Sequence, residues 1–509
     1  MARLLPGRHF DRTVPARMNN SSKTSTVSSN RLPLLSSCIS GFDEILGGGF
    51  PCHSLYLIQG LAGSGKTTLA CQIGFGHAAR GKKVLVLTLI AETHGKMLNH
   101  LSNFSFFDET LVGHNILFLG GYGELARGGL RGLLQFIASM LAEHQADLLI
   151  IDGFRSVRES TASDLGLAEF MLALSSLVSS MQCTSFLLSP VEGNIADSEN
   201  TLVDGVIELS QHEKGMQLLR EIKVFKIRGG KHLLGRHVFE FADDGIVAYP
   251  RLEAISTASH FDGAPSDLLR FGIPGWDALL RGGVGHGSTT ELLGNPGIGK
   301  TLMGLHFIHE GLSRGEQCLV AGFYETPPRL LEKARSVGLD LAPFIANGQL
   351  RIIWNPPLER LVDAWAYEIL ADADQRHVTR LLVDGMDGLR DIIMHVGRPR
   401  ALLSAFVNEL RCREVTTFFT RELPYFGDNQ QEHEGASSVL FDNIMLLRYV
   451  AIAGVNHRQA AVLKLRQNGY DAASHIMLIS EHGITLGRPV SEQMLAAATA
   501  PAHPVIERQ

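Results

Sequence analysis

Two glycine-rich segments carry the residue types and the spacing that bind phosphate groups. The segments are GLAGSGKT, which ends in Lys66 and Thr67, and GNPGIGKT, which ends in Lys300 and Thr301. Both fit the pattern G-x-x-x-x-G-K-[ST], in which backbone N–H groups wrap around phosphate oxygens and the lysine reaches the β- and γ-phosphates. The threonine hydroxyl is then placed to bind Mg²⁺. The sequence therefore predicts two sites for ATP and Mg²⁺; a glycine-rich turn with a surface lysine is the alternative.

Aspartates close two later apolar runs. Asp152 ends LLIID and Asp384 ends RLLVD, so each is expected at the end of a buried strand beside its loop, where it holds Mg²⁺ through water. A helix N-cap is the alternative role. Together with Thr67 and Thr301, these aspartates form the predicted metal sites. The predicted nucleotide contacts are Gly60, Gly63, Ser64, Gly65, Lys66, Thr67 and Thr68 in the first loop and Gly294, Gly297, Ile298, Gly299, Lys300, Thr301 and Leu302 in the second.

Two glutamates are placed to polarise an attacking water. Glu92 ends VLVLTLIAE and Glu325 ends CLVAGFYE, so each is expected near a strand end, where it can act as the catalytic base in hydrolysis. With Lys66 and Lys300 they make up the predicted catalytic residues. A solvated glutamate at a strand end is the alternative.

A Lys-x-Arg pair occurs late in each half of the chain. Lys226 and Arg228 in KVFKIR, and Lys464 and Arg466 in AVLKLR, alternate with apolar residues, so both cations of a pair project from one face of a strand. Lone cations on a strand are usually just solvated. Their recurrence at the same place suggests instead a finger that reaches the γ-phosphate on a neighbouring subunit.

An internal repeat organises the chain. GFDEILGGG from Gly41 returns as GWDALLRGG from Gly275, 234 residues later, and the lysine, aspartate and arginine landmarks above recur in the same order. Collinear pairs of this kind indicate duplicated domains of roughly 220 residues. The predicted organisation is a flexible arm at 1–33, a first domain at 34–251, a linker at 252–266, a second domain at 267–488 and a tail at 489–509.

Short aliphatic runs alternate with helix-length segments in each repeat, which is typical of a parallel sheet covered by helices. Both halves then end in two runs that resemble antiparallel strands. This order predicts the α/β class with two tandem RecA-like P-loop domains, each a mainly parallel sheet flanked by helices. The expected buried strands are 55–59, 84–90, 148–152 and 184–189 in the first half and 289–294, 318–323, 380–385 and 416–420 in the second.

The composition is that of a folded chain without a basic excess. Of 509 residues 45% are hydrophobic, and 46 Lys plus Arg against 52 Asp plus Glu give a net charge of −6. Proteins devoted to nucleic acid usually carry a basic excess, so nucleic-acid binding is disfavoured. The six cysteines lack metal-ligand spacing, and the chain shows neither an apolar signal segment nor a long apolar run. We therefore expect a cytoplasmic protein with reduced thiols and no membrane association.

Residues 34–488 resemble the KaiC family, the double-domain circadian-clock ATPases of the RecA superfamily. The resemblance lies in the glycine-rich lead-ins, both P-loops, ETHGKML and ETPPRLLEKA, both aspartates, and the ending KIRGGKHLLGRHVFEFADDGI with His232. It implies ATP-dependent homohexameric double rings with ATP held between subunits, slow hydrolysis in the first domain and serine/threonine autokinase activity in the second. It also implies a KaiB-like or signalling protein partner. The residues supplied to a neighbour's nucleotide would be Lys226, Arg228, His232, Lys464 and Arg466.

The sequence departs from that family in two places. The family has two adjacent glutamates after the second strand, whereas this chain has Ala91 before Glu92 and Tyr324 before Glu325, which leaves one carboxylate in each half. Ser438 falls at the family's phosphoserine position and is the predicted phosphosite, but a valine occupies the phosphothreonine position. Two alternatives stay open: a RecA/RadA-like DNA recombination ATPase, and a scaffold that binds ATP without turnover.

Overall fold

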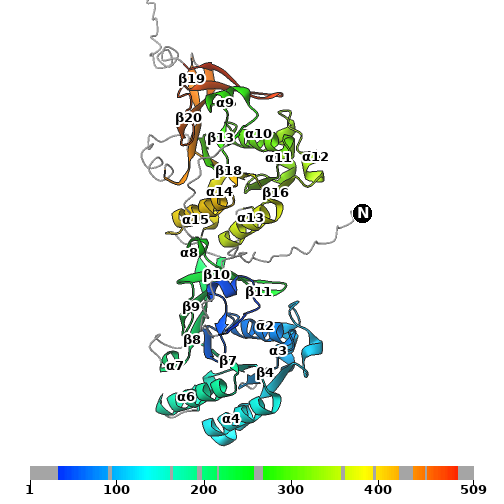
Figure 1. The fold of residues 1–509 in the computed structure, drawn as a ribbon, viewed down its shortest axis with the longest axis vertical. Helices are drawn as coiled ribbons and strands as arrows, with labels where there is room; N and C mark the ends of the chain where they lie inside the picture. The colour runs from blue at the N-terminus through cyan, green and yellow to red at the C-terminus, as the bar shows by residue number, and fades with distance from the viewer. Residues whose placement is uncertain are drawn as a thin grey trace, which may run out of the picture. The chain divides into compact units, whose positions relative to one another are not determined.

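The computed structural model describes residues 33–89, 94–160, 164–191, 198–214, 217–256, 267–356, 361–393, 397–423, 439–452 and 455–490. The chain divides into two compact units, with the boundary between Ile255 and Ser256. Each unit contains a nine-stranded, mainly parallel sheet flanked by helices (Figure 1). The predicted fold class of two tandem RecA-like α/β domains is therefore confirmed.

The sheet of the first unit has the order β11-β10-β9-β8-β3-β7-β6-β4-β5. The six strands from β8 to β5 in this order run parallel, and β8, β9, β10 and β11 pair antiparallel. A small sheet of β1 (Leu34–Leu35) and β2 (Phe50–Pro51) precedes it. The strands of the main sheet are β3 (Leu55–Gly60), β4 (Val84–Thr88), β5 (Ile116–Gly120), β6 (Leu148–Asp152), β7 (Thr184–Ser189), β8 (Gly205–Lys214), β9 (Gln217–Ile227), β10 (Arg236–Ala242) and β11 (Gly245–Tyr249).

Helices cover both faces of this sheet, because successive strand residues point to opposite sides. On β4, Val84 and Val86 join the core under α2, whereas Leu85 and Leu87 join a second core under α4 and α6. The helices α4 and α6 contact one another on that face (Figure 1). The described helices are α1 (Phe42–Ile45), α2 (Lys66–Ala78), α3 (His94–Leu101), a 3₁₀ turn at Glu109–Leu111, α4 (Tyr122–His144), α5 (Arg155–Glu159), α6 (Asp164–Ser180), α7 (Ser198–Leu202) and α8 (Leu252–Ile255).

The second unit repeats this plan, with the strand order β16-β15-β17-β18-β14-β19-β20-β21-β22. Its strands are β12 (Leu268–Leu269), β13 (Val284–Gly285), β14 (Thr289–Gly294), β15 (Cys318–Gly322), β16 (Leu350–Trp354), β17 (Arg380–Asp384), β18 (Thr416–Glu422), β19 (Asn443–Ile452), β20 (Val455–Leu465), β21 (His475–Ser480) and β22 (Gly483–Pro489). Its helices are α9 (Pro274–Leu279), α10 (Lys300–Ser313), α11 (Pro327–Arg335), α12 (Ala342–Ala346), α13 (Val362–Arg376), α14 (Met386–Ile392) and α15 (Pro399–Cys412).

The eight strands expected from the sequence are present, with ends that differ by at most two residues. The antiparallel endings are also present, as β8 with β9 and β19 with β20. The sequence reading did not include β5 and β16, which are the outer strands of the parallel part and are only partly buried. The start of the expected linker is the short helix α8.

Candidate nucleotide sites

The first P-loop connects β3 to α2 and has the backbone that its glycines allow. Gly63 and Gly65 adopt φ values of 76° and 101°, which side chains other than glycine rarely take. The Lys66 ammonium crosses the loop and donates hydrogen bonds to the carbonyls of Gly60 and Leu61, both at 2.8 Å. Burial lowers the pKa of Lys66, and the charge of Asp152 opposes that shift.

The second P-loop, between β14 and α10, has the same geometry. Gly297 and Gly299 have φ values of 69° and 115°, and Lys300 donates to the carbonyls of Gly294 and Asn295 at 2.9 Å. Burial again lowers the pKa of the lysine. The repeat in the sequence therefore corresponds to a repeat in the site.

Each loop is followed by a hydroxyl–carboxylate pair of the kind that binds Mg²⁺. Thr67 Oγ1 donates to Asp152 Oδ2 at 2.8 Å, and Thr301 Oγ1 lies 3.0 Å from Asp384 Oδ2. Each aspartate is the last residue of its strand, as predicted. In the second site Thr420, on the adjacent β18, adds a further hydrogen bond to Asp384 at 2.6 Å.

The sequence reading missed Thr420. The equivalent residue of the first unit is Leu188, which pairs with Ile58 of β3 as Thr420 pairs with Leu292 of β14. Because Leu188 is a buried leucine, comparing the two repeats could not point to a hydroxyl at position 420. Burial raises the pKa of Asp384, and the hydrogen bonds from Thr420 and Thr301 oppose that rise.

Both loops fit a bound Mg-nucleotide. The helices α2 and α10 begin at Lys66 and Lys300, and no side chain caps their N-termini, which leaves backbone N–H groups for an anion. A Cβ built on Gly63 or Gly297 would meet no atom within 4 Å, so these loops leave room for phosphate. The threonine–aspartate pairs supply oxygen ligands, which Mg²⁺ prefers.

The two predicted catalytic glutamates have different outcomes. Glu92 lies outside the described residues. Glu325 lies three residues beyond the end of β15, rather than on the strand, and forms an ion pair with Lys333 of α11. The Tyr324 ring before it is largely exposed and lies beside Gly385, the residue after Asp384.

Two further carboxylates distinguish the second site, and the sequence reading missed both. Asp387 accepts a hydrogen bond from the Glu422 N–H at 2.9 Å, and the next N–H, of Leu423, donates to the carbonyl of Gly294 at 2.9 Å. The end of β18 is thereby tied to the P-loop. The charges of Glu422, Asp384 and Asp387 oppose the lowering of the Lys300 pKa that burial causes. The positions 232 residues earlier are an arginine and a proline, so the two sites differ in charge.

The first Lys-x-Arg pair lies at the opposite end of the sheet from its own P-loop. β3 begins at Leu55, whose N–H donates to Asp204 Oδ2 at 3.0 Å, and ends at Gly60, where the loop starts. The Arg228 guanidinium lies at the beginning, 3.7 Å from Asp204 Oδ1, and donates to the Thr201 carbonyl at 2.8 Å. Leu55 and Gly60 are five residues apart on β3, and a rise of about 3.3 Å per residue separates these places by roughly 16 Å.

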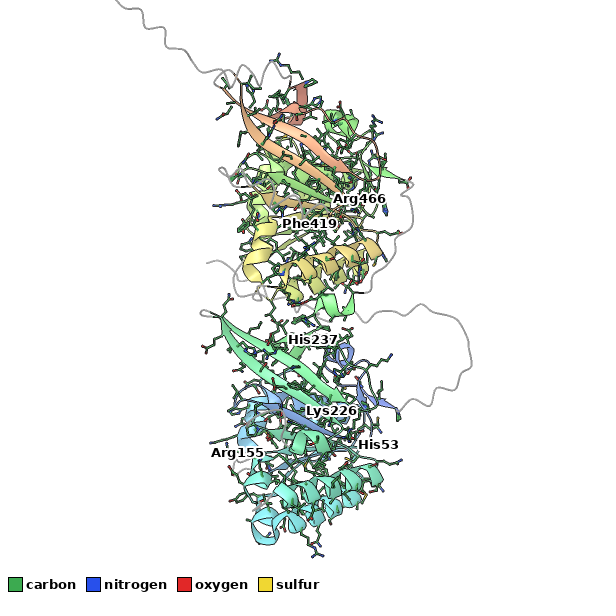
Figure 2. All side chains as sticks on the ribbon, turned by 90° about the vertical axis from the view of Figure 1, so that its left-hand side faces the viewer. His53, Arg155, Lys226, His237, Phe419 and Arg466 are labelled. Carbon is green, nitrogen blue, oxygen red and sulfur yellow. The ribbon has the colours of Figure 1, made fainter. Side chains whose placement is uncertain are left out.

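Lys226 lies at the same place, on the long antiparallel pair β8–β9 (Figure 2). Its ammonium donates to the Asn200 carbonyl at 2.6 Å and, like Arg228, is within hydrogen-bond distance of the Thr201 carbonyl. The pKa of Lys226 is lowered, first by burial and then by the charge of Arg228. Two cations thus share a small region, with the carboxylate of Asp204 beside them.

The second unit repeats this arrangement. Lys464 donates to the Phe441 carbonyl at 2.6 Å, and Arg466 lies 3.6 Å from Asp442 Oδ1. The other oxygen of Asp442 accepts the N–H of Thr289, the first residue of β14, at 3.0 Å. The strand register shifts by one residue beside both lysines. Val206 pairs with Lys226 but Ile207 with Val224, and Ile444 pairs with Lys464 but Met445 with Val462. Figure 2 labels Arg466 at this place.

His232 follows the first pair in a segment that the glycine-rich lead-in holds. The N–H of the next residue, Leu233, donates to the Ile45 carbonyl at 2.8 Å, and a Cβ on Gly47 would meet the Lys231 carbonyl at 1.8 Å. Burial lowers the pKa of His232. In the second unit the equivalent position is Tyr470, because Asp471 makes the matching hydrogen bond to Leu279. The predicted phosphosite Ser438 lies outside the described residues.

This fold and these loops define the class of P-loop nucleoside triphosphatases with RecA-like domains. The model of the KaiC ATPase family matches residues 35–253 and 269–491, and the chain belongs to that family. Within the described helices, none is long and apolar enough to cross a membrane.

Relatives of this chain include circadian clock oscillator proteins named KaiC. The chain is 25% identical over 489 residues to the circadian clock oscillator protein KaiC of Parathermosynechococcus lividus, covering 94% of this chain and 89% of the relative. It is 24% identical to KaiC of Synechococcus elongatus (91% and 90% covered) and 24% identical to KaiC 1 of Synechocystis (87% and 87% covered).

Proposed function

We propose that the protein is a homo-oligomeric ATPase that binds Mg-ATP at both P-loops, hydrolyses it slowly and acts as a nucleotide-dependent signalling switch. The lysine, threonine and aspartate of each site support the binding step, since they match the groups that hold β- and γ-phosphates and Mg²⁺. The names of the relatives support a signalling role, in which the nucleotide state governs the docking of a KaiB-like partner. The cytoplasmic location stays a prediction.

The observation that carries the oligomer is the position of the Lys-x-Arg pairs. Arg228 lies roughly 16 Å from its own P-loop along β3, so it cannot complete that site. A head-to-tail neighbour would bring it to the nucleotide of another subunit, and repeated head-to-tail contacts close into a ring when the rotation permits. We infer a hexamer with ATP between subunits, to which His232 and the pair Lys464 and Arg466 also contribute.

Light scattering with and without Mg-ATP tests this proposal. Nucleotide that binds only the assembled form stabilises it by mass action, so the mass should rise from monomer to hexamer when Mg-ATP is added. Arg228→Ala should weaken that response, whereas Arg131→Ala, which removes an exposed cation of α4, should not. A chain that remains monomeric at tens of micromolar protein with saturating ATP would contradict the ring.

A scaffold without turnover is the second candidate, and one observation favours it. Of the two predicted catalytic bases, the structure describes Glu325, and its carboxylate forms an ion pair with Lys333. Steady-state phosphate release distinguishes the two, since a scaffold binds ATP and releases none. The DNA recombination ATPase is a weaker candidate because the net charge is −6. Autophosphorylation of Ser438 by the second P-loop is the remaining part of the proposal.

A further inference from the structure

An ion pair lies close to the second nucleotide site. Lys333, in the last turn of α11, forms an ion pair with Glu325, in the turn between β15 and α11. Both side chains are about two-thirds buried, with exposed fractions of 38% and 31%. Because Leu330 and Ala334 of the same helix are buried, α11 is held against the core and Lys333 stays on the face toward the turn.

The pair lies within electrostatic reach of the predicted Mg²⁺ ligand. Glu325 follows the last residue of β15 by three, and that residue, Gly322, is in register with Asp384 on β17. The pKa of Asp384, which burial raises, is raised further by the charge of Glu325 and lowered by that of Lys333. Lys333 also contributes to the lowered pKa of Lys300. The ion pair is therefore part of the surroundings of the second nucleotide site.

The first unit has no lysine at the equivalent position. Glu92 precedes Glu325 by 233 residues, and the residue 233 before Lys333 is His100, an exposed residue of α3. The two units therefore carry different residues at this position of the helix, a lysine in the second and a histidine in the first.

We propose that Lys333 is a positioning residue that holds Glu325 in an ion pair and thereby keeps hydrolysis at the second site slow. This inference rests on the proposed ATPase function. In hydrolysis, water attacks the γ-phosphorus, the bond to the ADP oxygen breaks, and the proton of the water passes to the glutamate carboxylate. A carboxylate engaged by Lys333 must leave that ion pair before it can orient water and accept the proton.

The test uses the full chain with Lys66→Ala, so that phosphate release reports the second site. Lys333→Met should raise kcat by about 2- to 5-fold, the scale of a partly exposed ion pair, with little change in KM for ATP. Lys333→Arg keeps the ion pair and should retain the slow rate. Arg335→Met removes a cation from the exposed side of the same helix and is the matched control.

Dependence on Glu325 separates the proposed role from a structural one. In a Glu325→Gln background, Lys333→Met should give no gain, because there is no carboxylate to release. An unchanged kcat in Lys333→Met, or an equal gain in the Glu325→Gln background, would overturn the inference. Lys333→His, which installs the residue of the first unit, is judged by the same criteria if the methionine variant does not fold. Absence of Mg-ATP binding at the second site would instead contradict the proposed function.

Discussion

A buried histidine of the second unit should make that unit sensitive to acid. His306 on α10 is 8% exposed and its Nε2 accepts a hydrogen bond from the Ile484 N–H at 3.2 Å, so the fold requires the neutral ring. Burial, with a smaller effect of the nearby His309, lowers its pKa from 6.5 to about 4. The unfolded chain therefore binds the proton more readily, and stability is lost as the pH falls from 6.5 toward 4. At pH 5 the expected loss is about 2 kcal/mol.

The first unit supplies the matched substitution. Gln72 occupies the equivalent place on α2, and its Oε1 accepts the Ile246 N–H at 2.8 Å. His306→Gln should keep the hydrogen bond and remove the group that takes up the proton. Calorimetry should therefore show that the second unit loses less unfolding free energy between pH 8 and pH 5 in this variant than in wild type. Gln72→His should give the first unit the acid sensitivity that the second loses. An equal loss of stability in wild type and His306→Gln would refute the reasoning.

Two further predictions concern which nucleotide site hydrolyses ATP and which one supports autophosphorylation. Lys66→Ala should abolish most phosphate release and Lys300→Ala less, because the first domain has the fuller ending KIRGGKH with His232, whereas the second has Tyr470 at that position; a greater loss in Lys300→Ala would reverse the assignment. If the chain phosphorylates itself, mass spectrometry after incubation with Mg-ATP should find the phosphate at Ser438, and Lys300→Ala should remove it while Lys66→Ala need not. Phosphate found mainly in the first domain, or persisting in Lys300→Ala, would contradict this.

Much of the fold could be predicted because its signals are local. Each P-loop is one contiguous segment between a strand and a helix, and each aspartate directly ends an apolar run. The offset of 234 residues then allowed the two halves to be compared position by position. The edge strands β5 and β16 were harder, because a strand with one partner and partial burial leaves a weaker apolar pattern.

The rest depends on contacts that no short pattern records. The ion pair of Glu325 with Lys333 joins residues eight apart across a turn, and Thr420 reaches Asp384 from a neighbouring strand. The distance between Arg228 and its own P-loop follows from the pairing of β9 with β8 and of β8 with β3, which the sequence reading did not fix. The spacing of Lys226 and Arg228 therefore predicted a pair of cations that reaches a neighbour's nucleotide. It did not predict at which end of the sheet the pair lies.

Mixing two variants that are inactive at the first site tests most directly whether that site is completed by a neighbour. Both variants keep the second P-loop, so that Mg-ATP bound there can hold the ring; one carries Lys66→Ala and the other Arg228→Ala. Phosphate release by the second site is measured in each variant alone and subtracted. In a ring of randomly mixed subunits, about a quarter of the interfaces pair an intact first P-loop with an intact arginine. The account predicts that phosphate release by the first site reappears on mixing, toward about a quarter of its rate in the unmutated protein. A mixture no more active than the mean of its two components would contradict it.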